Sequence, residues 1–296
     1  MKFKKLLAVA FAAILMFTAV ACGSSGGNPA DTEAVNAALD RFRSCTSFTA
    51  SRIFRWQEAV TDGELTELFD GRSEMSFSII TGEQPRMRLS NLMQVENGGD
   101  VVEQSSTSYL VPENGGYSEY STDGYRWSVF SYEDGSALSA MNASYFIATF
   151  LTDDIGFSKA GEDNLAGGKA TRYDGTVSGE ALVALLEVNG QLSDVSSMSE
   201  SQQANIKSNL AKDLDGLTLS VWIDEASGYP VYFQVSLTEI LEDMNESISK
   251  SLGNKSENSQ WSITEYVISM SVSDFNAVEE IVLPPEAASA TPYAGS

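Results

Sequence analysis

The chain has no histidine, two cysteines, and 18 lysines and arginines against 41 aspartates and glutamates, for a formal net charge of −23. Without histidine, a Ser-His-Asp triad cannot form and the commonest metal ligand is missing. The sequence also lacks a G-x-S-x-G elbow and a glycine-rich phosphate loop of the Walker type. The acidic balance argues against a nucleic-acid partner and against lying flat on an anionic bilayer, because both need basic residues. We therefore expect a non-enzymatic protein without cofactor or metal.

Three acidic stretches invite a different interpretation: Asp153-Asp154, Asp224-Glu225 and Asp213 to Gly216. A glycosidase needs two carboxylates that face each other across a cleft, and adjacency in sequence gives no evidence of that. The third stretch begins like a calcium loop but lacks the later ligands. Since each falls at a predicted helix end or turn, we interpret all three as solvated acids of turns and helix ends.

Cys22 ends a stretch with three lysines in its first five residues, an unbroken apolar run from Leu6 to Phe17, and small residues just before the cysteine. This is the layout of a secretory signal peptide. It resembles a bacterial lipoprotein signal, whose lipobox it matches from Ala19 to Cys22. The resemblance implies that Cys22 carries lipid, with palmitate-type acyl chains, and anchors the protein on the extracytoplasmic face of the cell membrane. The alternative is an uncleaved transmembrane helix, for which the apolar run is shorter than the roughly 20 residues required.

The remaining chain shows no strict repeat and no interior linker, so a single domain is the simplest organisation. We expect a signal peptide at 1–21, the lipidated cysteine with a flexible Gly/Ser tether at 22–28, one domain at 29–287, and a frayed tail at 288–296.

The domain is predicted to begin with a helix from Pro29 to Ser44. Helical spacing places an apolar set on one face, made of Val35, Ala38, Leu39 and Phe42. Cys45 follows this stretch. Because only one cysteine remains after Cys22, it has no internal disulfide partner, and we expect a small buried hydrophobe rather than a redox group.

From Ser47 the apolar period changes to two, which predicts strands joined by short turns. The predicted strands include 72–81, 86–96, 101–111, 117–121, 125–132, 169–177, 217–224, 229–236 and 261–272. Helical spacing returns at 136–151, 178–188, 194–213 and 237–248. Short turns favour antiparallel pairing, because parallel strands need long crossovers. The pattern therefore predicts an α+β fold with helices on one face of a long antiparallel sheet.

Four stretches resemble one family, the LolA/LppX-like superfamily, in its small-lipoprotein branch of Gram-positive bacteria. They read GYSEYSTDGYRWSVF at 116–130, GKATRYDGTVSGEAL at 168–182, VWIDEASGYPVYFQVSL at 221–237 and SDFNAVEEIVLPPEA at 273–287. None of these motifs is catalytic. The resemblance implies a strongly curved antiparallel half-barrel with helices packed on its concave side, and an acyl chain or lipid bound between sheet and helices.

Eight apolar residues could line such a space: Met75, Phe77, Met87, Leu89, Met93, Phe146, Ile147 and Phe150. The plainer interpretation is ordinary core, since apolar residues at strand and helix spacing usually pack on each other. Methionine suits both roles, because it fills irregular gaps and adapts to variable ligands.

Two functions remain open. The first is a membrane-anchored, non-enzymatic lipoprotein that binds a hydrophobic or lipid-like ligand between sheet and helices. The second is an envelope interaction or sensor module with a packed core, which contacts a protein partner through aromatics such as Tyr117, Tyr120, Tyr125 and Trp127. A two-lobed solute-binding protein fits poorly, because repeated α/β units are absent.

Overall fold

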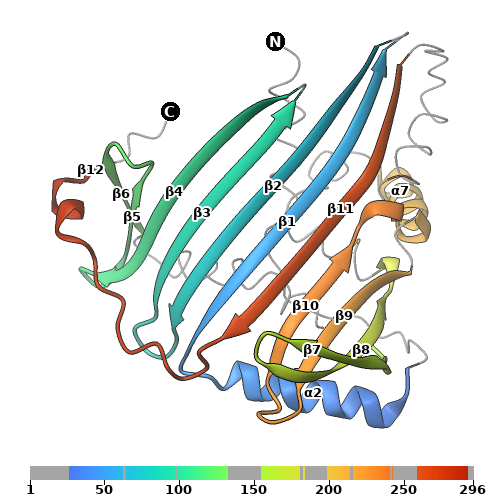
Figure 1. Cartoon of the computed structure of the whole chain (residues 1–296), viewed down its shortest axis with the longest axis horizontal. Coiled ribbons are helices and arrows are strands. Elements are labelled where there is room, and N and C mark those ends of the chain that lie inside the picture. Colours follow the sequence, from blue (N-terminus) through green and yellow to red (C-terminus); the bar gives the residue numbers. More distant parts are fainter. Residues whose placement is uncertain are drawn as a thin grey trace.

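The computed structural model describes residues 27–62, 65–97, 99–132, 155–180, 183, 199–213, 216–240, 242 and 259–292. They form one sheet of 12 strands in the order β12-β6-β5-β4-β3-β2-β1-β11-β10-β9-β8-β7 (Figure 1). The strand pairs are antiparallel apart from β12 and β6, which run parallel. The sheet is not closed, so β12 and β7 are its two edges.

The strands are β1 Ser47–Asp62, β2 Leu65–Ile80, β3 Arg86–Asn97, β4 Asp100–Glu113, β5 Gly116–Thr122, β6 Trp127–Tyr132, β7 Phe157–Leu165, β8 Gly168–Val177, β9 Leu217–Asp224, β10 Pro230–Ser236, β11 Ser259–Ser273 and β12 Thr291–Pro292. Among the described residues, the helices whose two ends are both described are α2 Pro29–Arg43, α7 Glu200–Asp213 and the short 3-10 helix η1 Pro285–Ser289. β1 to β6 follow one another as a meander, and β7 to β11 lead back so that β11 pairs with β1. Figure 1 shows β7 and β8 crossing at a steep angle to β1–β4, as expected of a twisted sheet.

The predicted meander is confirmed. It could be predicted because its turns are specified by residues within the turns themselves. In the hairpin between β5 and β6, the Asp123 carboxylate accepts backbone N–H bonds from Tyr125 and Arg126 at 3.0 and 3.2 Å. Gly124 takes φ +92° there, a conformation that glycine reaches without strain. The T-D-G signal therefore specifies the turn without help from the rest of the chain.

The first helix is confirmed together with its buried face. The Asn28 side chain caps α2 by accepting from the N–H of Ala30 at 3.0 Å, and Pro29 occupies the first turn. The buried residues of α2 are the four predicted: Val35, Ala38, Leu39 and Phe42. Cys45 is buried with 4% of its surface exposed, and burial raises the pKa of its thiol. The expectation of a small buried hydrophobe is confirmed.

The predicted fold class is wrong. Strand accounts for 59% of the described residues and helix for 20%, so the fold is a large open sheet rather than an α+β half-barrel with helices packed on a concave side. The helix with the clearest buried face, α2, contacts β7, β9 and β10 and so covers one end of the sheet (Figure 1). The expectation rested on helical spacing at 136–151, 178–188 and 237–248, which lie wholly or mostly outside the described residues. The expectation also underestimated the length of the strands in the hairpins: β1 and β2 each have 16 residues.

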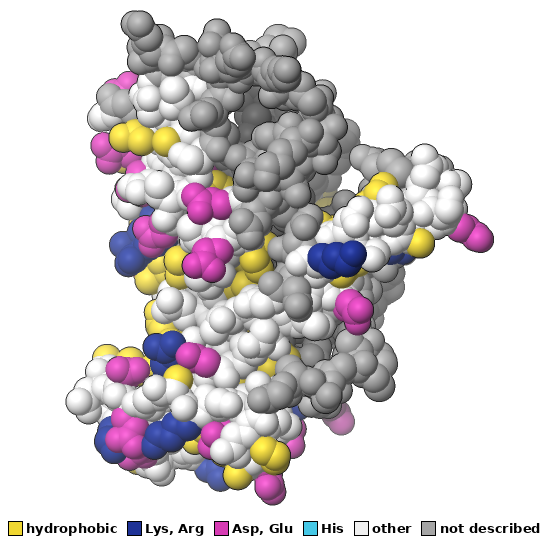
Figure 2. Space-filling model, turned by 90° about the vertical axis from the view of Figure 1, so that its right-hand side faces the viewer, with side chains coloured by type: hydrophobic (Ala, Val, Ile, Leu, Met, Phe, Trp, Pro, Cys, Tyr) yellow, Lys and Arg dark blue, Asp and Glu magenta, His cyan; other side chains and the backbone are white. Residues whose placement is uncertain are grey.

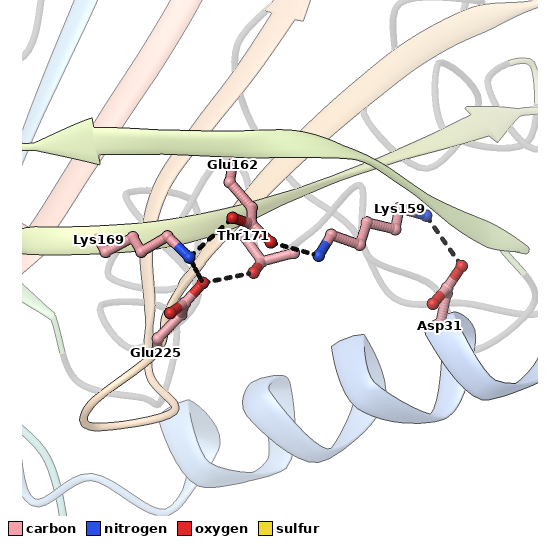
Figure 3. Close-up of polar contacts among 6 residues, drawn as sticks. All are labelled: Asp31, Lys159, Glu162, Lys169, Thr171 and Glu225. Atoms are coloured by element: carbon pink, nitrogen blue, oxygen red, sulfur yellow. Dashed lines mark hydrogen bonds and ion pairs between the residues drawn. The ribbon is translucent and has the colours of Figure 1, made fainter.

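β7 is an edge strand that the sequence did not indicate, because its side chains are mostly exposed and do not alternate clearly. The start of α2 pairs with its backbone: Asn28 N–H donates to the Phe157 carbonyl, and Phe157 N–H donates to Thr32 Oγ1, both at 2.9 Å. Lys159 N–H donates to the Asp31 carboxylate at 2.9 Å (Figure 3). A register shift between Lys159 and Gly161 bends the strand next to this contact. These features protect the edge from pairing with another chain.

The two faces of the sheet differ in chemistry. One face, called here the inner face, carries the buried cluster that includes Phe48, Phe54, Phe77, Phe157 and Phe233. The opposite, outer face carries many hydroxyls along β1, β2, β3 and β11; one cross-strand row runs through Thr107, Ser90, Ser76, Ser51 and Ser271. On the side of the molecule that carries α7, acidic and basic side chains are interspersed (Figure 2).

Candidate functional site

Five of the eight predicted lining residues lie together on the inner face of β2 and β3. Phe77 stands opposite Leu89, Met87 stands opposite Ile79, and Met93 stands opposite Ser73. Met75 shares this face two residues from Phe77 along the same strand. The remaining three, Phe146, Ile147 and Phe150, lie outside the described residues, as does Cys22.

The five residues differ in how much of their surface is exposed. Phe77 and Met87 are 2% and 7% exposed and belong to the buried cluster. Met75 and Leu89 are half-buried and pack against the margin of that cluster. Met93 is also half-buried. With two half-buried neighbours on the same face they form what we call the inner strip: Trp56, Met75, Leu89, Met93 and Val95.

Trp56 holds its place in the inner strip because Gly71 stands opposite it on β2. A Cβ on Gly71 would come within 1.9 Å of the Trp56 indole, so the missing side chain makes room for the ring. The indole stacks on Phe54 with ring centroids 4.8 Å apart, and Phe54 meets Tyr266 edge to face at 4.7 Å. Aromatic packing on Phe54 therefore fixes the indole ring, and the space left by the missing side chain of Gly71 accommodates it.

Arg52 places a charge on this apolar face. It is 4% exposed, and burial lowers the pKa of its guanidinium to about 10. Met75 is its cross-strand partner on β2, and Arg52 Nη2 donates to Met75 Sδ at 2.6 Å. A thioether is a weak acceptor for a charged donor. Arg52 also takes part in at least one further interaction.

Two uncharged polar side chains accompany Arg52. Asn91 is the cross-strand partner of Met75 on β3, so Arg52 and Asn91 flank Met75 on either side. Ser73 is 4% exposed and donates from Oγ to Asn91 Oδ1 at 3.2 Å. These residues were not among those predicted to line the site. The signal was present, because each is a polar residue at an inward position of an alternating strand.

The aromatic residues of the alternative hypothesis do not form one patch. Tyr117 lies on the inner face against the buried cluster, opposite Tyr132. Tyr120 lies on the outer face, where its hydroxyl donates to Glu113 at 2.9 Å. Trp127 is half-buried on the outer face, and Tyr125 is 96% exposed in the turn between them.

The acidic stretches have structural partners where they are described. The Asp224 carboxylate accepts from the N–H and hydroxyl of Ser227 at 2.7 and 2.6 Å, which lowers its pKa. Glu225 pairs with Lys169 at 3.1 Å and accepts from Thr171 at 3.3 Å (Figure 3). Asp213 ends α7, and Asp153-Asp154 lie outside the described residues. Within the described part of the chain, no group of three or more acidic or cysteine side chains is arranged to hold a metal ion.

No family model matches the chain, and no curated protein matches it in sequence. Among solved structures it is similar to LprF from Mycobacterium bovis, with a TM-score of 0.37 and 14% identity over 88% of this chain and 99% of that one. It is also similar to a putative outer membrane lipoprotein-sorting protein domain from Vibrio parahaemolyticus, with a TM-score of 0.21 and 9% identity over 85% and 94%. A DUF1329 family protein from Desulfovibrio piger gives 0.22 and 7% over 85% and 94%.

The TM-scores and identities of these neighbours are too low to carry an argument about family, ligand or activity. None of the helices in the described ranges combines the length and the apolar character needed to cross a membrane.

Proposed function

We propose that this protein is a lipid-anchored extracytoplasmic lipoprotein that binds a hydrophobic or lipid-like ligand on the inner strip, without catalysing a reaction. The observation that carries the proposal is the contrast in burial along the inner face. Apolar residues at β9 and β10 are completely buried, whereas Met75, Leu89 and Met93 present apolar surface that is half-buried. An acyl chain that binds to this half-buried apolar surface is removed from water together with the surface, which favours binding.

The residue types of the inner strip suit a ligand of variable shape. Met75 and Met93 are unbranched and flexible, so their side chains can repack around chains of different length. Trp56 offers a rigid ring face fixed by Phe54 and Gly71. A strip that combines adaptable residues with a rigid platform at one end can bind alkyl chains without demanding one geometry.

The test uses the chain from residue 22 with Cys22→Ser, because every contact described above lies between residues 27 and 292. ω-Brominated dodecanol is the probe, since bromine quenches tryptophan and Trp56 lies in the strip. We expect saturable quenching that Trp56→Phe removes. Leu89→Gln on the inner face should weaken binding, while Leu92→Gln, three residues along β3 on the outer face, should not. Quenching that is absent, or equally affected by both glutamines, would contradict the proposal.

The anchor has a separate test. Full-length Cys22→Ser should be released from membranes or remain unprocessed, because no thiol is left to carry the lipid. Fractionation and metabolic labelling with a palmitate analogue measure this. A variant that is still cut and still fractionates with membranes would contradict the lipid anchor, whatever the binding assay shows.

A further inference from the structure

We propose that the ligand is an amphiphile with an anionic head, a carboxylate or a phosphate, which binds over Met75 between Arg52 and Asn91. This rests on the proposed function, which it deepens by naming the class of ligand. Three adjacent strands place the residues in one cross-strand row: Arg52 on β1, Met75 on β2 and Asn91 on β3. Since neighbouring strands are about 4.8 Å apart, the Cα atoms of Arg52 and Asn91 are about 10 Å apart, with Met75 between them.

The row carries hydrogen-bond donors on both sides of Met75. Arg52 Nη2 is directed at Met75 Sδ. Asn91 accepts from Ser73 through Oδ1, and among the described residues its Nδ2 amide group has no acceptor. A head group above Met75 would therefore meet an arginine on one side and an amide N–H on the other. Donors on both sides favour a ligand group that only accepts, such as a carboxylate or phosphate.

A ligand oxygen can replace Met75 Sδ as the acceptor of the hydrogen bond from Arg52. The thioether of Met75 is a weak acceptor on a flexible side chain, so a charged oxygen that displaces it forms a stronger, charge-assisted bond with Arg52. Arginine has five N–H donors, so the further interaction of Arg52 can persist while the bond to Met75 is replaced. The acyl chain would then lie along β3 over Leu89 or Met93, which stand two residues to either side of Asn91.

The location also suits the charge of the protein. With a net charge of −23, most of the surface repels an anion. Arg52, by contrast, has apolar neighbours on the inner face of β1 and β11, among them Phe54 and Met270, beside its further interaction. An ionic contact in such a setting is stronger than one at the surface, because water screens it less. Selectivity for an anionic head thus follows from where the charge lies rather than from the overall charge.

The experiment compares three probes of equal chain length: ω-brominated dodecanoate, dodecyl phosphate and dodecanol, on the Cys22→Ser chain. We expect at least one anionic probe to bind about tenfold tighter than the alcohol, which corresponds to one charge-assisted hydrogen bond. Which anion binds tighter distinguishes a carboxylate from a phosphate ligand. If none of the probes binds, the proposed function fails. If the alcohol binds as tightly as both anions, the proposed function stands and the anionic head is wrong.

Two variants locate the head group. Asn91→Asp adds a negative charge facing Met75 and should remove the preference for the anion, measured as the ratio of anion affinity to dodecanol affinity. Ser90→Asp makes the same change of charge one residue earlier on β3, on the outer face, and should leave the preference intact. Arg52→Gln should also equalise the probes, and circular dichroism checks its fold. Equal effects of Asn91→Asp and Ser90→Asp would overturn the assignment.

Discussion

The inner face of the sheet has two halves that follow the same strand alternation and end in different environments. On β9 and β10, Leu219, Val221, Phe233 and Val235 are 0% exposed. On β2 and β3, Met75, Leu89 and Met93 are half-buried, and polar Ser73 and Asn91 lie among them. The first half is built from residues with well-defined rotamers, and all four belong to the buried cluster.

The difference shows that apolar alternation marks a face of a sheet but does not by itself mark a core. A packed half excludes polar groups, because each buried one needs a partner. The other half holds Arg52 against a thioether and joins Ser73 to Asn91, so it keeps polar groups within an apolar surface. We interpret the first half as the part that stabilises the domain and the second as the part that binds.

The largest expected effect is a difference in the free energy of unfolding between a substitution in the packed half and one in the other half. Phe233→Ala removes a ring that is completely buried opposite Val221 and Met270. It should lower the free energy of unfolding by about 3–5 kcal/mol, because a cavity remains. Met93→Ala on the strip should cost about 1 kcal/mol or less, as expected away from a packed core.

Urea unfolding measures both variants, compared at unchanged slope. Equal losses would mean that Met93 lies in ordinary core, and the division of the inner face would then be wrong.

The sequence predicted most of what depends on local signals. Asn28, Pro29 and the spacing of the apolar residues specify α2, and Asp123 with Gly124 specifies the hairpin from β5 to β6. β7 could not be predicted, because an exposed edge strand buries too few residues to alternate; it depends on hydrogen bonds from the start of α2, more than 100 residues earlier.

The candidate site was predicted for its apolar members and missed for its polar ones. Met75, Phe77 and Leu89 alternate visibly along their strands. Arg52 also stands at an inward position, but it is paired across the strands with Met75 on β2 and Met270 on β11. Those pairings join residues 23 and 218 positions away from Arg52, which no short window of sequence contains. The fold class failed for a related reason: spacing shows where helices can form and says nothing of how much of the chain the sheet occupies.

A smaller effect tests the rigid end of the inner strip. Gly71→Ala would press a methyl group into the Trp56 indole, so the ring must move. Overpacking of this kind should cost about 1–3 kcal/mol and change the near-ultraviolet circular dichroism, which reports the tryptophan environment. Gly161→Ala on β7 is the matched control, because nothing lies within 4 Å of the added methyl group. It should leave stability unchanged or slightly raised.

If Gly71→Ala leaves both the spectrum and the stability unchanged, Trp56 does not rest on Gly71, and the ring cannot be the platform that we assign to it. If Gly71→Ala loses the near-ultraviolet signal but still binds the probe, the ligand lies on Met75, Leu89 and Met93 alone. The binding half of the inner face would then exclude Trp56.

The smallest expected effect concerns the β7 edge, where surface ion pairs lie beside the hydrogen bonds from α2. Glu162 lies 2.7 Å from both Lys159 and Lys169 (Figure 3). The hydrogen bonds from these lysines lower the pKa of Glu162 from 4.5 to about 2. A carboxylate whose pKa is lowered by folding stabilises the folded state above its ordinary pKa, and this contribution is lost as the pH falls through about 2.

Glu162→Gln should therefore lower the Tm slightly at neutral pH, and the difference from the unmodified protein should shrink as the pH falls from 4.5 to about 2. The difference should also shrink when salt rises from about 0.01 M to about 1 M, because exposed charges are screened. Glu83→Gln is the matched control: it removes the same charge from an exposed residue in the turn between β2 and β3. Thermal unfolding of the two variants separates the ion pairs from net charge, because only the Glu162 variant loses a specific contact. Identical curves at every pH would mean that the edge depends on α2 and the bulge alone, whereas a Tm loss as large as that of Phe233→Ala would place a main source of stability at the edge instead of in the packed half.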